Sequence, residues 1–358
     1  MNKNNQHICL VDGSTYIFRA YHALPPLTRK SDGFPVGAIS GFCNMLDKLV
    51  REEKEKRGIT HIVVVFDASG KTFRNEIYKD YKANRSEAPE DLVPQFPVIR
   101  QATSAFNIPY VELIGFEADD LIASYAKEAE QKDMQVTIVS SDKDLMQLVS
   151  NKTSMLDTMK GKLIDKDGVF EKFGVYPEKV IDVQSLAGDS VDNIPGIPGI
   201  GIKTAALLIN EYGDLKGLFK NASSIKQNKR RENIIEFEDQ AYISKKLVTL
   251  KDDVPVKDKI ENFIIKEIKK DKLYSFLREM EFNRLLSQAI GFYGEPDKKT
   301  ENIEIAQEKI DLTKYETITT EKQFENWVNI LKKQNLISVD TETSVSYTHL
   351  TLPTILLV

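Results

Sequence analysis

Nine acidic residues occur where strands are expected to end or helices to begin. They are Asp12, Asp67, Glu117, Asp119, Asp120, Asp142, Asp144, Asp189 and Asp192. Four follow short apolar runs, and ligands of open α/β sheets bind beyond the carboxyl ends of the strands. Three open the helical pattern "GFEADDLIASYA", and the last two are three residues apart, so they can share one face of a turn. We therefore expect all nine at one edge of a sheet.

Such a gathering of carboxylates predicts bound cations. Without lysine or arginine partners the acids would repel one another, and metal ions would relieve that repulsion. Oxygen ligands without histidine or cysteine favour Mg²⁺ or Mn²⁺. Two ions about 3.5–4 Å apart are the arrangement used for phosphodiester hydrolysis. Each acid alone has a simpler explanation, as a turn residue, a helix cap or a first-turn residue at the positive end of a helix.

The stretch "KTFRNEIYKDYKANRSEAPEDL" (71–92) interleaves aromatic and basic side chains directly after Asp67. Rings that stack on bases and cations that contact phosphates are typical of single-strand binding. The alternative is an amphipathic helix that buries its aromatics in the core. The interleaved residues are Lys71, Phe73, Arg74, Tyr78, Lys79, Tyr81, Lys82 and Arg85.

A second phosphate-binding candidate is "NIPGIPGIGIKTAALLI" (193–209). Its glycines precede an apolar helix, so backbone N–H groups and a helix N-terminus can approach phosphate oxygens. This favours a helix–hairpin–helix that grips duplex DNA without reading its sequence; the alternative is a plain turn between two helices. The residues expected at the DNA are Gly196, Gly199, Gly201, Lys203 and Thr204. The basic run 220–231 adds to this grip or is only a solvated face.

The elements that must position these residues alternate in type. Apolar runs predict strands at 7–12, 61–67, 134–140 and, weakly, 108–113, and helical periodicity covers 37–56 and 118–132. This alternation predicts an α/β fold with a largely parallel central sheet. From about residue 175 only helical patterns follow.

Composition narrows the class of protein. The 358 residues are 41% hydrophobic and 29% charged, with no apolar run long enough for a membrane helix. Two cysteines, Cys9 and Cys43, predict no disulfide framework and a reducing, cytoplasmic setting. No cluster has zinc-site spacing. The formal net charge of −5 becomes positive once the nine acids are set aside, so it does not argue against nucleic acid.

The five motifs "VDGSTYIFRAYHAL", "VVFDASGKTFRNEIYKDYKANR", "GFEADDLIA", "SSDKDLMQLV" and "LAGDSVDNIPGIPGIGIKTA" occur together in this order. Over roughly residues 6–290 the chain resembles the 5′-nuclease domain of bacterial DNA polymerase I. The resemblance implies a PIN-like α/β domain with a helical arch and a helix–hairpin–helix that binds K⁺. It also implies a monomer that removes 5′ flaps and RNA primers from DNA in replication and repair.

The resemblance assigns roles to the residues named above. One metal would lie among Asp12, Asp67, Glu117, Asp119 and Asp120, and the other among Asp142, Asp144, Asp189 and Asp192, with some contacts through water. Catalytic residues of the arch would be Arg74, Tyr81, Lys82 and Arg85. Asp340 and Glu342 in "LISVDTET" match the first metal motif of a 3′→5′ exonuclease domain, but the remaining motifs are absent, so neither proofreading nor polymerisation is expected.

These assignments divide the chain into five parts. The last, 345–358, contains no charged residue; we interpret it as a non-native tail, with an ordinary apolar strand as the alternative. The expected parts are a catalytic domain (1–174), a helical DNA-binding region (175–290), a linker (291–310), a truncated exonuclease domain (311–344) and this tail.

Two other functions remain open. A PIN-type ribonuclease would share the acidic sheet edge but would not need the helix–hairpin–helix. A non-catalytic DNA-binding module would need the hairpin but not nine carboxylates.

Overall fold

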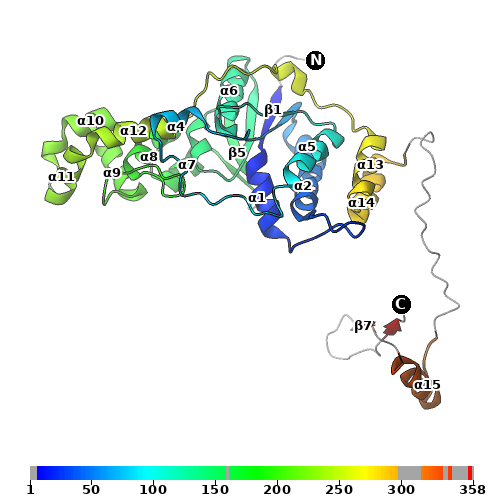
Figure 1. The fold of residues 1–358 in the computed structure, drawn as a ribbon. Coiled ribbons are helices and arrows are strands. Elements are labelled where there is room, and N and C mark those ends of the chain that lie inside the picture. Colours follow the sequence, from blue (N-terminus) through cyan, green and yellow to red (C-terminus); the bar gives the residue numbers. More distant parts are fainter. Residues whose placement is uncertain (1–5, 159–160, 297–315, 334–337, 341–353, 357–358) are drawn as a thin grey trace. The chain divides into compact units, whose positions relative to one another are not determined.

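A six-stranded sheet is the centre of the fold, in the order β3-β2-β1-β4-β5-β6 (Figure 1). The computed structural model describes residues 6–158, 161–296, 316–333, 338–340 and 354–356, and the chain divides into two units, Met1–Thr300 and Glu301–Val358. The sheet belongs to the first unit, and its pairings are parallel except for the last. Its strands are β1 (His7–Asp12), β2 (His61–Val65), β3 (Tyr110–Val111), β4 (Gln135–Val139), β5 (Thr153–Asp157) and β6 (Lys162–Ile164).

Helices cover both faces of this sheet. Ile8 and Leu10 of β1 join the core under α6 and the helices α7 to α12 (166–248), whereas Cys9 and Val11 share a core with α1, α2, α5, α13 and α14. This alternation on a strand buried on both faces explains why β1 and β2 read as continuous apolar runs. The covering helices are α1 (Gly13–Ala23), α2 (Gly37–Lys48), α5 (Gln95–Ala105), α6 (Ala118–Gln131), α13 (Lys270–Glu279) and α14 (Asn283–Tyr293).

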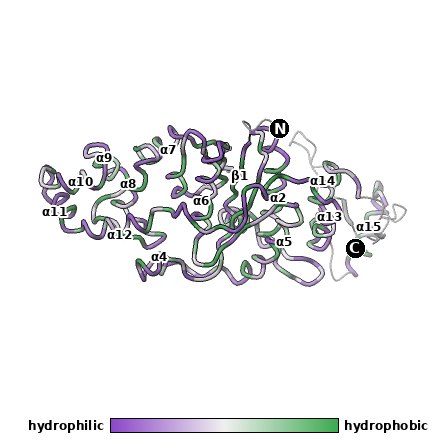
Figure 2. The backbone as a smooth tube through the Cα atoms, turned by 90° about the horizontal axis from the view of Figure 1, so that it is seen from above, coloured by the Kyte–Doolittle hydropathy of each residue, from purple (hydrophilic) through white to green (hydrophobic). Residues whose placement is uncertain are grey.

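The helical region after the sheet lies on one side of it in Figure 1. It consists of α7 (Lys166–Phe173), α8 (Val180–Ala187), α9 (Ile202–Tyr212), α10 (Leu215–Lys220), α11 (Asn228–Glu236) and α12 (Glu238–Val248). Apolar side chains of α8 and α9 are continuous with the core on the α6 face of the sheet. The chain is markedly hydrophilic along α11 (Figure 2), where Asn228, Lys229 and Glu232 are exposed.

The predicted α/β class with a largely parallel sheet is confirmed, as are strands at 7–12, 61–65, 110–111 and 135–139. Strands β5 and β6 were not predicted. The helical pattern 37–56 is interrupted by a π-helical turn, Leu49–Glu53, before α3 (Lys54–Arg57). Within 71–92 the helical portion is the short α4 (Phe73–Ile77), followed mainly by turns.

The second unit holds α15 (Glu321–Leu331), which begins with a capping box between Thr320 and Gln323. Two short strands, β7 (Ser338–Asp340) and β8 (Thr354–Leu356), pair antiparallel, so part of the apolar tail is a strand. Glu342 and most of the expected linker lie outside the described residues. Among the described helices, none is long and apolar enough to cross a membrane.

Candidate active site

Three adjacent parallel strands bring the first acids to one edge. Asp12 ends β1, Asp67 lies two residues beyond β2, and Asp142 lies three residues beyond β4. Because β2, β1 and β4 are neighbours in register, these carboxylates emerge at the same edge, as the sequence predicts.

Short polar contacts hold two of these carboxylates. Asp12 is buried and caps α1, accepting hydrogen bonds from the Thr15 backbone N–H at 3.0 Å and the Ser140 hydroxyl at 2.7 Å. Burial raises the pKa of Asp12 to about 6, against the opposing effect of these hydrogen bonds. Asp67 accepts from the Ser14 hydroxyl at 2.5 Å and from the Ala118 backbone N–H at 2.8 Å, which ties it to the start of α6.

Asp119, in the first turn of α6, stands at the centre of the acidic charge. Its pKa lies well above the usual range, first because of burial and then because of Asp142, Asp12, Asp67 and Glu117. Five acids from four separate segments therefore share one electrostatic neighbourhood. This like-charge repulsion exceeds what a helix first turn requires, so the simple helix-dipole explanation does not account for Asp119.

A further acidic group lies after β4. Burial and the neighbouring charge of Asp142 raise the pKa of Asp144 to about 7. Gln184 of α8 donates its amide N–H to Asp144 at 2.5 Å. Lys143, between the two acids in sequence, forms an ion pair with Asp189 at 2.5 Å.

The expectation that the acids lack cationic partners is wrong for four of the nine. Arg74 binds Asp120 through two hydrogen bonds of 2.7 and 2.8 Å, and Lys82 pairs with Glu117 at 2.9 Å. Arg85 donates to Asp192 at 3.0 Å, and Lys143 pairs with Asp189. Within the described part of the chain, the acids with no ion pair are Asp12, Asp67, Asp119, Asp142 and Asp144. The argument for bound cations therefore rests on these five.

Asp120 differs from the metal ligand expected of it. It is fully buried, and besides Arg74 it accepts from the backbone N–H groups of Glu117 at 3.1 Å and Lys251 at 2.9 Å. Both of its oxygens are thus engaged with protein donors. Arg74 is equally buried and also donates to the Leu247 carbonyl at 2.8 Å, so this pair joins α4, α6 and the end of α12.

The expected stacking role of Tyr81 is also corrected. Its ring is buried against Ile194, Leu247 and Val248, and its hydroxyl donates to Glu117 at 3.1 Å. A ring enclosed in this way cannot stack on a base. For Tyr81 the alternative of a core aromatic is the one observed, while Lys82 and Arg85 keep their charged ends at the acids.

The donor set fits hard divalent ions. No three acidic or histidine side chains among the described residues stand close enough to hold an ion as they are, but the five unpaired acids are all oxygen donors. The buried oxygen Oε1 of Gln184, beside Asp144, lacks a hydrogen-bond partner, and it is the one such buried side-chain atom in the described chain. An unsatisfied acceptor of this kind calls for a missing donor, such as the water carried by a metal ion.

The glycine-rich loop connects α8 to α9. A Cβ on Gly196 would lie 2.3 Å from the Ala187 carbonyl oxygen, so only glycine permits this close return of the chain. Asn233 and Gln240 donate to the carbonyls of Pro198 and Gly196, both at 2.7 Å, and hold the loop from behind. Gly199, Gly201 and Lys203 are exposed and Thr204 is half-buried, which leaves the start of α9 open to a ligand.

Sequence reasoning missed Lys143, Gln184, Ser14, Thr15 and Ser140. Lys143 was visible in "SSDKD" as a cation between two acids. Nothing in the sequence singles out Gln184, because its contact with Asp144 joins residues 40 positions apart.

The chain is similar in sequence to known polymerases and nucleases and in fold to known nucleases. The chain is 57% identical over 286 residues to DNA polymerase I of Rhizobium leguminosarum, covering 79% of this chain but 28% of that protein. It is 41% identical over 279 residues to the 5′-3′ exonuclease of Aquifex aeolicus, covering 78% of this chain and 93% of the relative. A flap endonuclease of bacteriophage T5, solved with DNA and metal ions, shares the fold with a TM-score of 0.58 at 22% identity, covering 79% of this chain and all of that one.

The family assignment follows from these matches. The chain spans only about a third or less of the polymerases that it matches, but nearly all of the free-standing exonuclease. Residues 7–174 match the N-terminal resolvase-like domain of 5′-3′ exonucleases, and residues 175–271 match their C-terminal SAM fold. The chain therefore belongs to the 5′-3′ exonuclease family.

Proposed function

We propose that this chain is a structure-specific 5′ nuclease that removes 5′ flaps and RNA primers from DNA with two divalent metal ions, Mg²⁺ or Mn²⁺. The observation that carries the proposal is the set of five carboxylates without ion pairs around Asp119 and Asp144, in a chain that also has an exposed glycine-rich loop before α9. The setting is cytoplasmic, the chain acts as a monomer, and its parent is a DNA polymerase I.

We assign the metal-holding residues from the five acids without ion pairs, and add Glu117, Asp189 and Asp192, which pair with Lys82, Lys143 and Arg85 in this structure. Asp12, Asp67, Asp119 and Glu117 would hold one ion, and Asp142, Asp144, Asp189 and Asp192 the other. Asp120 positions Arg74 and does not itself bind metal. Bound ions supply a Lewis acid that activates water and neutralises the leaving oxygen.

Lys82 and Arg85 provide the positive charge for the substrate. They hold Glu117 and Asp192 in this structure, and the Lys82 ammonium also lies 3.8 Å from Asp192. Bound metal ions would supply positive charge to these carboxylates, and Lys82 and Arg85 would then be available to contact the scissile phosphate and stabilise its developing charge. Tyr81 keeps Glu117 oriented through its hydroxyl.

The hairpin sets the distance between the duplex and the cut. Residues 1–174 would carry catalysis and 175–290 the duplex, with Gly199, Gly201, Lys203 and Thr204 at its backbone. A K⁺ ion at this hairpin is part of the proposal, on the resemblance alone. Residues 311–344 would correspond to the start of an exonuclease domain.

A flap duplex tests the proposal. The protein is incubated with a 5′-labelled flap, a blunt duplex and single-stranded RNA, each with Mg²⁺ or with EDTA, alongside Asp142→Asn. We expect Mg²⁺-dependent cutting at the flap junction that the substitution abolishes. Cutting of RNA alone would support the ribonuclease alternative, and binding without cutting would support the DNA-binding module.

Gln184→Leu should weaken metal binding. The substitution removes the N–H that orients Asp144, and loss of such an outer hydrogen bond typically costs about 10- to 100-fold in metal affinity. Because it also removes the unsatisfied buried oxygen, thermal stability should not fall. Calorimetric titration with Mn²⁺ measures the effect, with Gln101→Leu on the exposed surface of α5 as the control. Equal affinities in both variants would refute this role.

The metal-free protein should become more stable as the pH falls from 8 to 6. Asp12, Asp119 and Asp144 have raised pKa values in the folded chain, so between pH 4 and 7 the folded state binds more protons than the unfolded state. Stability is therefore lost as the pH rises through this window. Melting curves in EDTA measure it. Added Mg²⁺ should raise Tm more at pH 8 than at pH 6, because protons compete for the same oxygens; a smaller Mg²⁺ effect at pH 8 would contradict the scheme.

A further inference from the structure

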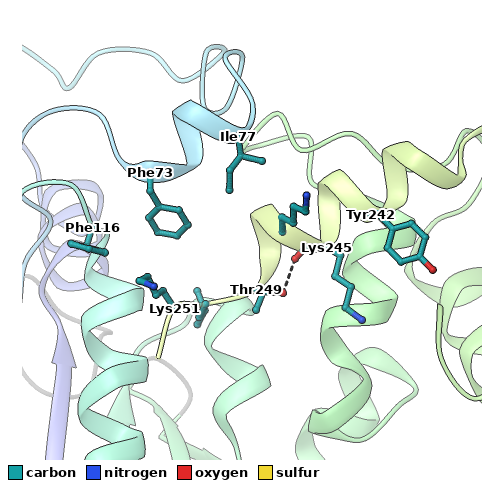
Figure 3. Close-up of a pocket in the computed structure, with 9 residues that line it drawn as sticks. Phe73, Ile77, Phe116, Tyr242, Lys245, Thr249 and Lys251 are labelled. Carbon is teal, nitrogen blue, oxygen red and sulfur yellow. Dashed lines mark hydrogen bonds between the residues drawn. The ribbon is translucent and has the colours of Figure 1, made fainter. Parts of the chain in front are cut away.

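A cavity of about 710 Å³ opens between α4 and α12 (Figure 3). Its apolar wall consists of Phe73 and Ile77 from α4, with Phe116 and Leu250. Three lysines, Lys245, Lys246 and Lys251, line the rest together with Tyr242. In Figure 3 Phe73 points from α4 into the space that faces α12.

Residues that line the cavity adjoin the acidic site along the chain. Phe73 directly precedes Arg74, and Phe116 directly precedes Glu117. The backbone N–H of Lys251 donates to Asp120. These links place the cavity lining beside Arg74, Glu117 and Asp120, so a single strand with a phosphate at the carboxylates would lie near it.

Its chemistry fits one unpaired nucleotide. The rings of Phe73 and Phe116 lie 6.1 Å apart at 48°, which gives a base an aromatic surface. Lys245 and Lys251 pair with Asp182 at 2.8 Å and with Asp253 at 2.7 Å, and Asp253 is largely exposed, so solvent weakens the second pair. Lys246 is exposed and has no ion pair in the described part of the chain, so its ammonium is available to a phosphate.

We propose that this cavity receives an unpaired nucleotide of the 5′ single strand, with the base against Phe73 and Phe116 and the phosphate at Lys246. The inference rests on the proposed nuclease function and adds to it a subsite for the flap. It would let the segment 71–92 hold a single strand although Tyr81 is buried, because Phe73 offers a ring that contacts the Arg74 guanidinium at 4.6 Å and also lines the cavity.

The test uses the full chain with Ca²⁺ in place of Mg²⁺, and duplexes with flaps of zero, one, two or four nucleotides carrying 2-aminopurine. In the wild-type protein, binding should quench the fluorescence of the flap base. Phe73→Leu should abolish the quenching and weaken binding of flapped duplexes by roughly five- to thirtyfold. Binding of the flapless duplex should not change.

A second variant keeps the proposal falsifiable if Phe73→Leu disturbs the fold. Lys246→Ala should lower the salt dependence of flapped-duplex binding by about one phosphate contact, whereas Lys272→Ala on α13, equally exposed, should not. Quenching retained in Phe73→Leu, or a salt dependence unchanged in Lys246→Ala, would overturn the subsite and leave the cavity to another ligand. If the wild-type protein cut no flap in Mg²⁺, the proposed function itself would fail, independently of the cavity.

Discussion

Asp119→Asn should reduce Mg²⁺-dependent flap cutting by at least about 100-fold and at the same time raise the Tm of the metal-free protein at pH 8. Outer-shell changes already cost 10- to 100-fold in activity or metal affinity, and Asp119 stands at the centre of the acidic group. Removing its charge relieves the repulsion from Asp142, Asp12, Asp67 and Glu117, so the folded state gains stability while the metal ions lose a ligand. Single-turnover cleavage and thermal melting in EDTA measure the two effects.

The opposite signs distinguish a metal ligand from a structural residue. Substitution of a residue that only supports the fold would lower the activity and the stability of the protein together. Asp133→Asn is a suitable control, because Asp133 is exposed and its pKa is lowered by Lys152. It should leave cutting unchanged. A lower Tm in EDTA for Asp119→Asn would show that the acidic group is not strained in the way described.

Arg74→Met should destabilise the protein by about 3–5 kcal/mol, because it leaves Asp120 buried without its cation. Cutting should be lost with it, since α4 would no longer be held to α6 and to the Leu247 carbonyl. Urea unfolding measures the free energy. If Arg74 served only to contact the substrate, Arg74→Met would leave the midpoint of urea unfolding unchanged.

The double substitution Arg74→Met with Asp120→Leu separates the two contributions. Replacing a buried ion pair by apolar residues of similar size is often neutral for stability. We therefore expect the double variant to regain most of the lost free energy. If Arg74 also contacts the substrate, cutting should stay low in this refolded variant; recovery of full cutting would restrict Arg74 to the fold.

Much of the sheet edge was predictable because its signals are local. Asp12, Asp67 and Asp142 each follow an apolar run, and parallel strands carry such residues to one edge. Strands β5 and β6 escaped prediction because "TSMLD" and "KLI" are short and mix polar with apolar residues, so tertiary pairing decides their state.

The pairing of the acids could not be predicted. Lys82 and Glu117 are 35 positions apart, and nothing in either segment indicates which acid receives which cation. The burial of Tyr81 has the same origin, because Leu247 and Val248, which enclose it, come from the end of α12. The spacing of residues in the sequence identifies the members of the site, whereas long-range packing determines which acids lack an ion pair and which rings are exposed.

The Arg74–Asp120 pair also bears on the order in which parts of the candidate site are completed during synthesis. Arg74 donates to the carbonyls of Leu247 and Thr249, which lie more than 170 positions later in the chain, and Asp120 receives the Lys251 N–H. Contacts of such long sequence separation form late, because the intervening chain must first be ordered. A nascent chain that has not yet released residue 251 from the ribosome lacks these partners, so we expect α4 to be fastened to α6 only after the helical region up to α12 has been synthesised.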